Sequence, residues 1–185
     1  MKIARYLAHG QVSYGVVDGN TVRQITTSPF EEYQVTDHTH ALSEVKLLPP
    51  TEPSKMLAVG LNYYSHLGDR PTPEQPLIFL KTPSSLVGQG DAIIRPRDAE
   101  TVQEEGELVV IIGKRARNVP KERALEYVLG YSCGNDVSAR EWQRGDGQWW
   151  RAKSSDTFSP VGPWMSDEID PFDAMLTARI NGKDV

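Results

Sequence analysis

Glycine and proline divide this chain into short segments, and this feature most limits the folds that it can adopt. The 185 residues include 15 glycines and 13 prolines. Proline removes a backbone donor from a helix or a central strand, and glycine favours turns. The apolar segments between them are short, which is typical of strands joined by turns rather than of a helical bundle. We therefore expect a loop-rich, mainly β (α+β) fold.

The first half-hundred residues have the pattern of a small β domain. Residues 2–26 are expected to form a β-meander, because short apolar segments are separated by turn signals at His9-Gly10 and at Asp18-Gly19-Asn20. The following stretch, 28–45, is polar and only weakly periodic. Three prolines in LLPPTEPSK, residues 47–55, indicate a linker.

The linker predicts two domains, a small N-terminal β domain at 1–50 and a larger domain at 54–185. In the larger domain the best helix candidate is 121–130, with apolar residues on one face and Gly130 as a stop. The last segment runs as a strand into an Asn181-Gly182 turn, and we expect its return strand to be absent. Further strands are expected in KMLAVGLNY, PLIFLK, PSSLVGQGDAIIRP and ELVVIIGK, and YSCGNDVSAREWQ is expected to run from a strand towards a helix.

Composition excludes several classes of function. The net charge is −5 and no cluster of Lys and Arg is present, which argues against nucleic-acid binding and against membrane-surface binding. No apolar stretch approaches the ~20 residues that span a bilayer, and the N-terminus lacks the apolar region of a signal peptide. The single cysteine, Cys133, excludes an internal disulfide and is expected to be buried. We therefore expect a cytoplasmic protein.

Acidic residues stand at the entrance to an apolar strand in EEGELVVIIGK, residues 104–114. Side chains at i and i+2 of a strand share one face, so Glu105 and Glu107 project together, whereas Glu104 points to the other face. Two close carboxylates repel each other unless a proton or a cation lies between them. Mg²⁺ and Mn²⁺ prefer such oxygen ligands, and Asp136 follows a second apolar segment. The alternative is a solvated strand end.

Other polar residues are candidates for catalysis or substrate binding. His66 and Asp69 are three residues apart, and a carboxylate can orient a histidine that acts as general base. Lys81 ends an apolar strand, and Lys153 lies among small polar residues. Each of these has a simpler interpretation as a surface group. Arg140 and Gln143 can share one helical face, and with Lys81 they are our candidates for substrate binding.

His38 and His40 alternate in TDHTH, which could indicate a metal site. No carboxylate or thiol pattern accompanies them nearby, so we interpret them as part of a surface loop.

The segments VGLNYYSH, IFLKTPSSLVG, EEGELVVIIGKRARNV, YVLGYSCGNDVSARE and GQWWRAKSSDTFSPVGPW together resemble the fumarylacetoacetate hydrolase (FAH) superfamily in its shorter bacterial form. The match spans about residues 55–180 in the family's order. The resemblance implies an FAH-type mixed β-sandwich roll behind the small N-terminal domain, usually in a homodimer. It implies an Mg²⁺ or Mn²⁺ cofactor held by Glu105, Glu107 and Asp136.

The resemblance also implies catalytic roles. His66 matches the family histidine, and Asp69 matches its acidic partner, which is commonly Glu. Lys153 matches a lysine that stabilises negative oxygen, and Gln143 matches a glutamine that contacts substrate. The common SFDTF pattern is SSDTF here, so Ser155 replaces an aromatic residue near the substrate.

The implied activity is metal-dependent hydrolysis of a C–C bond in acylpyruvate-like or fumarylacetoacetate-like 2-oxo acids through a metal-bound enolate. The alternatives are an isomerase or decarboxylase of 2-hydroxymuconate-like diacids in aromatic catabolism, and an inactive truncated β-module. The family's catalytic domain continues beyond Val185 and includes a Gly-Thr-Pro motif. We therefore expect a fragment or a truncated gene product that folds poorly or is inactive alone.

Overall fold

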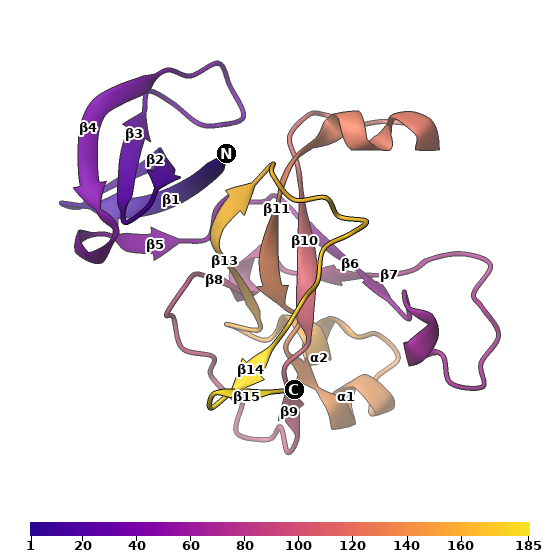
Figure 1. Cartoon of the computed structure of the whole chain (residues 1–185). Helices are drawn as coiled ribbons and strands as arrows, with labels where there is room; N and C mark the ends of the chain where they lie inside the picture. Colours follow the sequence, from indigo (N-terminus) through magenta and orange to yellow (C-terminus); the bar gives the residue numbers. More distant parts are fainter.

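Strands dominate the computed structural model, which describes residues 1–185 (Figure 1). This confirms the expected mainly β fold. The two α-helices are α1 (Arg140–Gly145) and α2 (Trp150–Ser154), and the short 3-10 helices are η1 (Leu42–Glu44), η2 (Tyr64–His66), η3 (Pro83–Ser85) and η4 (Lys121–Tyr127). The strands are β1 (Lys2–Ala8), β2 (Gln11–Asp18), β3 (Thr21–Ile25), β4 (Val35–Ala41), β5 (Lys46–Leu48), β6 (Met56–Gly60), β7 (Leu77–Lys81), β8 (Leu86–Val87), β9 (Val102–Gln103), β10 (Gly106–Ile112), β11 (Val128–Asn135), β12 (Ser138–Ala139), β13 (Ser159–Ser166), β14 (Arg179–Ile180) and β15 (Lys183–Asp184).

The N-terminal strands form the expected antiparallel meander. β1 pairs with β2, β2 with β3, and β3 with β4. The first turn uses His9 and Gly10 in left-handed conformations, with φ of 49° and 80°, which matches the twist of a tight hairpin. β4 was not expected as a strand, because its side chains are mostly exposed and show no apolar alternation. It forms the outer edge of the sheet.

β13 joins the N-terminal meander to the rest of the molecule. The main sheet runs in the order β10-β11-β13-β1-β2-β3-β4, and β13 pairs with β1 through Ile3 and Met165. Ile3, Ile111 and Met165 form a small buried cluster at this junction. β13 carries two prolines, which sequence patterns treat as breaks, so its place in the sheet could not be recognised from local sequence.

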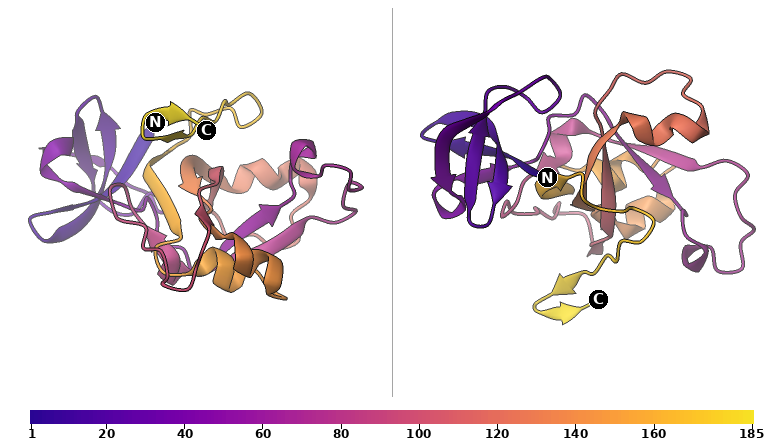
Figure 2. Two further views of the ribbon diagram at one scale, coloured as in Figure 1. Left: turned by 90° about the horizontal axis from the view of Figure 1, so that it is seen from below. Right: turned by 45° about the horizontal axis from the view of Figure 1, so that its top comes forward.

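Three expectations about the larger part of the chain were wrong. Residues 121–127 form a 3-10 helix with no buried residue, so the periodic pattern has nothing to pack against, and 128–130 already belong to β11. Cys133 is exposed, because it pairs with Leu108 on an open face of the sheet. The return strand after the Asn181-Gly182 turn is present, since Lys183 pairs with Ile180. Figure 2 shows this hairpin extending from the body of the molecule.

The core is small and divided into separate clusters. Only 30 of the 185 residues are buried, and the N-terminal cluster contains Ala4, Tyr6, Val17 and Val22. Large apolar side chains remain exposed on β6, β7 and β10. The helices fall short of the length and apolar character that crossing a lipid bilayer requires.

Packing between β7 and α2 positions two buried lysines, Lys81 and Lys153. β6 and β7 form an antiparallel hairpin, and the ring of Phe79 on β7 meets Trp149 edge-on at 5.5 Å between ring centroids. This contact holds the end of β7 against the start of α2. Lys81 and Lys153 are thereby carried into the same region of the molecule.

Candidate active site

Six of the nine predicted site residues are linked in one hydrogen-bonded cluster. They come from the end of β7, the approach to β10, the turn after β11, and both α-helices, which lie together beneath the sheet in Figure 1. The linked residues are Lys81, Glu105, Asp136, Arg140, Gln143 and Lys153. Because segments far apart in sequence meet here, the cluster is a property of the fold and not of one motif.

Lys153 lies between two carboxylates. Its side chain is 3% exposed, and its ammonium donates to Asp136 Oδ2 at 2.6 Å and to Glu105 Oε2. A buried ammonium is tolerated only where negative charge and acceptors surround it. The position of Lys153 therefore marks a point of strong negative potential inside the cluster.

Lys81 is also buried and uses its ammonium to join three segments. It donates to Asp136 Oδ1 at 2.5 Å, to the backbone carbonyl of Phe158 at 3.1 Å, and to the carbonyl of Lys153. Burial lowers the pKa of Lys81, although the charge of Asp136 partly offsets the effect. All three ammonium protons have acceptors within the protein, so Lys81 holds Asp136 and the end of α2 in place.

Arg140 connects the cluster to α1. Its guanidinium donates to Glu105 Oε1 at 2.8 Å, to Gln143 Oε1 at 2.8 Å and to Gln103 Oε1 at 2.6 Å. Arg140 and Gln143 therefore do share one helical face, as their spacing predicts. Burial acts to raise the pKa of Glu105, but hydrogen bonds and charge attraction from Lys153 and Arg140 outweigh it and lower the pKa to about 2.

Glu107 faces the same cluster without an ion pair of its own. It lies opposite Gly134 in the β10–β11 ladder and is half-buried. Burial raises the pKa of Glu107, and the negative charges of Asp136 and Glu105 raise it further. Glu104 is exposed, as its opposite orientation predicts. The three carboxylates thus form an uneven set, in which Glu107 has no ion-pair partner.

His66 and Asp69 lie apart from the linked residues. Both are exposed, and His66 ends η2 with its ring 6.2 Å from that of Tyr63. The ion pairs of the cluster join lysines and Arg140 to Glu105 and Asp136, and they include neither His66 nor Asp69. The charge of His66 nevertheless acts to lower the pKa of Glu107, although burial and the negative charges of Asp136 and Glu105 raise it overall.

Two supporting residues were missed by sequence reasoning. Ser138 is fully buried and donates to Glu105 Oε2 at 3.0 Å or to the carbonyl of Asp136 at 2.8 Å. Asn135 Oδ1 accepts the backbone N–H of Glu105 at 3.0 Å. Both lie within two residues of Asp136 in the segment NDVS. Nearness in sequence to an expected metal ligand is the only signal that could have identified them. They fix the direction in which Glu105 points.

The donor types fit a hard divalent ion. Carboxylate oxygens are the ligands that Mg²⁺ and Mn²⁺ prefer, and the uncompensated charge at Glu107 favours an added cation. As the side chains lie, no group of three His, Cys, Asp or Glu residues is placed to hold one metal ion. The Lys153 ammonium takes the position between Glu105 and Asp136. A divalent ion bound at these carboxylates would therefore lie close to the Lys153 ammonium, and the two positive charges would repel each other.

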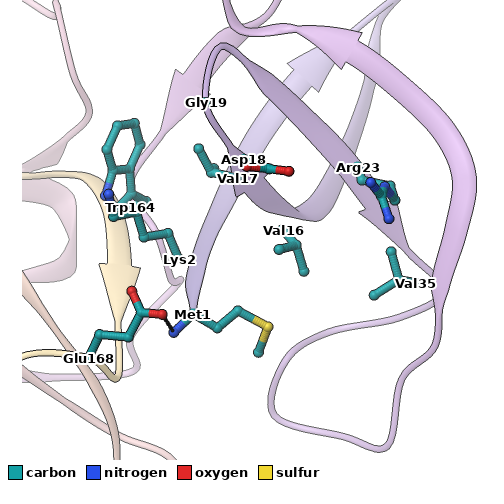
Figure 3. Close-up of a pocket in the computed structure, with 10 residues that line it drawn as sticks. All are labelled: Met1, Lys2, Val16, Val17, Asp18, Gly19, Arg23, Val35, Trp164 and Glu168. Carbon is teal, nitrogen blue, oxygen red and sulfur yellow. Dashed lines mark ion pairs between the residues drawn. The ribbon is translucent and has the colours of Figure 1, made fainter.

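A cavity of about 560 Å³ lies elsewhere, between the N-terminal strands and β13. Figure 3 shows Met1, Lys2, Arg23, Trp164 and Glu168 on its walls. None of the nine predicted site residues lines it, and its walls carry charged groups without a nucleophile or a carboxylate cluster. The charged cluster is therefore the candidate active site, because it holds the acidic and basic side chains that this cavity lacks.

The fold and the charged cluster define a mainly β protein of the FAH type. The chain belongs to the fumarylacetoacetate (FAA) hydrolase family, since residues 55–185 match the model of that family's C-terminal domain. Residues 1–50 match a second model, described as Rv2993c-like, N-terminal. The family expected from sequence motifs is thereby confirmed. Members of this family include isomerases, hydrolases and a tautomerase.

Curated relatives extend further than this chain. An uncharacterized protein of Archaeoglobus fulgidus is 43% identical over 185 residues, which cover 98% of this chain and 70% of that protein. A mitochondrial oxaloacetate tautomerase of Xenopus laevis is 38% identical over 172 residues, which cover 89% of this chain and 53% of that protein. The chain thus spans between about half and three quarters of the length of such relatives.

Solved structures show the same fold. The 5-carboxymethyl-2-hydroxymuconate delta-isomerase of Mycobacterium smegmatis superposes with a TM-score of 0.91 at 41% identity, over 100% of this chain and 74% of that one. The maleylpyruvate hydrolase of Sphingobium sp. SYK-6, in complex with manganese(II) and pyruvate, gives a TM-score of 0.69 at 29% identity, over 90% of this chain and 67% of that one. The first of these likenesses covers the whole of this chain.

Proposed function

We propose that this chain acts on a 2-oxo acid by forming and stabilising an enolate, with Mg²⁺ or Mn²⁺ held by Glu105, Glu107 and Asp136. The observation that carries the proposal is the pair of carboxylates, Glu105 and Asp136, around buried ammonium groups, with Glu107 near enough for their charges to raise its pKa. Such a site manages negative charge on oxygen, which is what enolate formation demands. When bound, the ion supplies positive charge that lowers the free energy of that oxygen.

The reaction that the geometry supports best is isomerisation or tautomerisation. Such a reaction removes a proton from one carbon next to a carbonyl and returns a proton at another position. It needs one acid–base group and charge stabilisation, but no activated water. Sequence reasoning ranked C–C hydrolysis first, with His66 and Asp69 as a paired base. The two are exposed and outside the cluster's ion pairs, which favours the simpler proton transfer.

Individual side chains are assigned as follows. His66 moves the proton between its imidazole nitrogen and the substrate carbon, with Asp69 as a weaker orienting group. Lys153 stabilises the negative oxygen once its ammonium leaves one carboxylate. Arg140 and Gln143, which are half-buried on one face of α1, meet the substrate carboxylate. Lys81 is the weakest of the candidates for substrate contact, because its three ammonium protons already have acceptors within the protein.

Hydrolysis of a C–C bond is the second candidate, and the likeness to the maleylpyruvate hydrolase of Sphingobium favours it. A product assay separates the two. The purified chain with Mn²⁺ would be given oxaloacetate, 5-carboxymethyl-2-hydroxymuconate and acetylpyruvate. Enol–keto interconversion or double-bond migration without new fragments supports isomerisation, whereas acetate and pyruvate from acetylpyruvate support hydrolysis. If Mn²⁺ does not bind and no substrate changes, the chain is the inactive β-module instead.

A homodimer is also proposed, on the basis of one apolar face. Leu57 pairs with Leu80 and Val59 with Ile78 in the β6–β7 hairpin, and all four side chains are exposed. An exposed apolar patch of this kind favours association. Light scattering after gel filtration tests it: Leu57→Lys should convert a dimer into a monomer, and a monomeric wild-type chain would contradict the proposal.

A further inference from the structure

Three of the four histidines of the chain line one small cavity in the N-terminal sheet. The cavity has a volume of about 360 Å³ and is lined by His9, His38 and His40, together with polar side chains from β2 and β3. His38 and His40 were expected in a loop without a partner. The structure instead places them on β4 and brings His9, from the β1–β2 turn, alongside.

The His9 and His40 rings lie close to the separation that one shared ion needs. Their centroids lie 5.7 Å apart with an interplanar angle of 52°. Zinc binds imidazole nitrogen at about 2 Å, so an ion shared by two imidazoles lies about 3 Å from each ring centre. Two ring centres around a tetrahedral ion are then about 5 Å apart. His9 is exposed, so a rotation of its side chain that closes the separation by under about 1 Å brings both imidazoles within reach of one ion.

The surroundings hold these rings in place and offer further ligands. His40 is half-buried, and Tyr6 contacts its ring edge-on at 5.7 Å between centroids. His38 is two residues from His40, and successive odd or even positions of a strand share a face. Gln24 and Ser13 also line the cavity and carry oxygen ligands. Since no group of three His, Cys, Asp or Glu side chains is fully assembled, His9 and His40 are the anchoring pair.

We propose that His9 and His40 form a binding site for a nitrogen-preferring divalent ion such as Cu²⁺, Ni²⁺ or Zn²⁺, completed by His38, an amide oxygen or water. Imidazole favours these ions over Mg²⁺ and Mn²⁺, which prefer oxygen. The site is therefore chemically distinct from the carboxylate cluster. None of the residues assigned to the proposed reaction lines this cavity.

Occupation of this site would connect two parts of the sheet that share no backbone hydrogen bond. β4 is the outermost strand and pairs only with β3, whereas His9 belongs to the turn between β1 and β2. An ion bound by His9 and His40 would link the edge strand β4 to the β1–β2 hairpin. The bound ion would stabilise the N-terminal sheet by mass action.

The test is a Cu²⁺ titration of the whole chain in excess Mg²⁺, followed by electron paramagnetic resonance. Excess Mg²⁺ competes for oxygen sites, nitrogen hyperfine structure reports nitrogen ligands, and the histidine variants show which of these are imidazoles. We expect one Cu²⁺ per chain with at least two nitrogen ligands. His9→Asn should weaken binding by roughly tenfold or more, and Asn tolerates the left-handed backbone at this turn.

Two further variants make the assignment specific. His40→Gln should weaken binding as His9→Asn does, and circular dichroism checks that its sheet is intact. His66→Gln, which changes the one remaining histidine, should leave Cu²⁺ affinity unchanged. Oxygen-only ligation, unchanged affinity in His9→Asn, or loss of binding in His66→Gln would each overturn the proposal.

Discussion

Replacement of Lys81 by methionine should destabilise the fold far more than loss of an ordinary lysine. The Lys81 ammonium is buried and donates to Asp136 Oδ1 at 2.5 Å, to the Phe158 carbonyl at 3.1 Å and to the Lys153 carbonyl. Lys81→Met keeps most of the side-chain volume but removes all three donors. The acceptors would remain buried, away from water that could replace the ammonium.

The size of the effect follows from these lost contacts. Each carbonyl left without a donor costs about 1–3 kcal/mol, and removal of one partner from a buried ion pair costs about 3–5 kcal/mol. Asp136 keeps its bond to Lys153 at 2.6 Å, which reduces the second cost. We therefore expect a loss of about 3–5 kcal/mol in the free energy of unfolding. This is a large share of the total stability of an ordinary domain.

Urea unfolding followed by tryptophan fluorescence measures this loss, and hydrogen exchange locates it. Amide protection at Asp136 and Phe158 should fall first, because both residues are held by Lys81. Lys46→Met is the matched control. Lys46 pairs with Asp91 at 2.8 Å, but its side chain is 54% exposed, and such surface pairs contribute about 0–1 kcal/mol. Equal stability of the two variants would refute the structural role of Lys81.

Three further predictions concern the candidate active site. Lys153 and Arg140 lower the pKa of Glu105 to about 2 from 4.5. Ionised Glu105 therefore stabilises the metal-free fold above pH 4.5, and this stabilisation is lost as pH falls towards 2. In urea titrations Glu105→Gln should flatten the dependence of stability on pH over this range, and an unchanged dependence would contradict the stabilising role of Glu105. Lys153→Met should tighten Mn²⁺ binding in calorimetry, because the ammonium competes with the ion for the same carboxylates. The variant should also lower turnover, because the ammonium stabilises the negative oxygen. Weaker Mn²⁺ binding would show that the ammonium does not compete with the ion. His66→Gln should reduce turnover roughly 100-fold or more with Mn²⁺ affinity unchanged, and intact turnover would remove the acid–base assignment.

Local patterns account for two of the side-chain arrangements in the candidate site. Glu105 and Glu107 have i, i+2 spacing, and the charges of Glu105 and Asp136 act on Glu107. Arg140 and Gln143 have i, i+3 spacing and are in hydrogen-bond contact. These features depend on the geometry of a single strand or a single helix. Sequence periodicity reports such geometry directly.

Features that depend on long-range pairing could not be derived in this way. A lysine at the end of an apolar strand is usually solvated, yet Lys81 finds acceptors 55, 72 and 77 residues away and becomes buried. β13 is a sheet strand despite its two prolines, because it pairs with neighbours from both halves of the chain. His9 lies in the β1–β2 turn and His40 on β4, and the tertiary fold brings their rings together. In each case the partner is set by the tertiary fold.

Direct Mn²⁺ binding tests the proposed metal centre most sharply. Electron paramagnetic resonance of free Mn²⁺ would be used to titrate the wild-type chain, Glu107→Gln and Glu104→Gln. The charges of the cluster act on Glu107, whereas Glu104 is its exposed neighbour in the same segment. We predict one Mn²⁺ per wild-type chain, affinity at least about tenfold weaker in Glu107→Gln, and no change in Glu104→Gln. Absence of binding to the wild-type chain, or equal affinity in the two variants, would contradict a divalent ion at Glu105, Glu107 and Asp136.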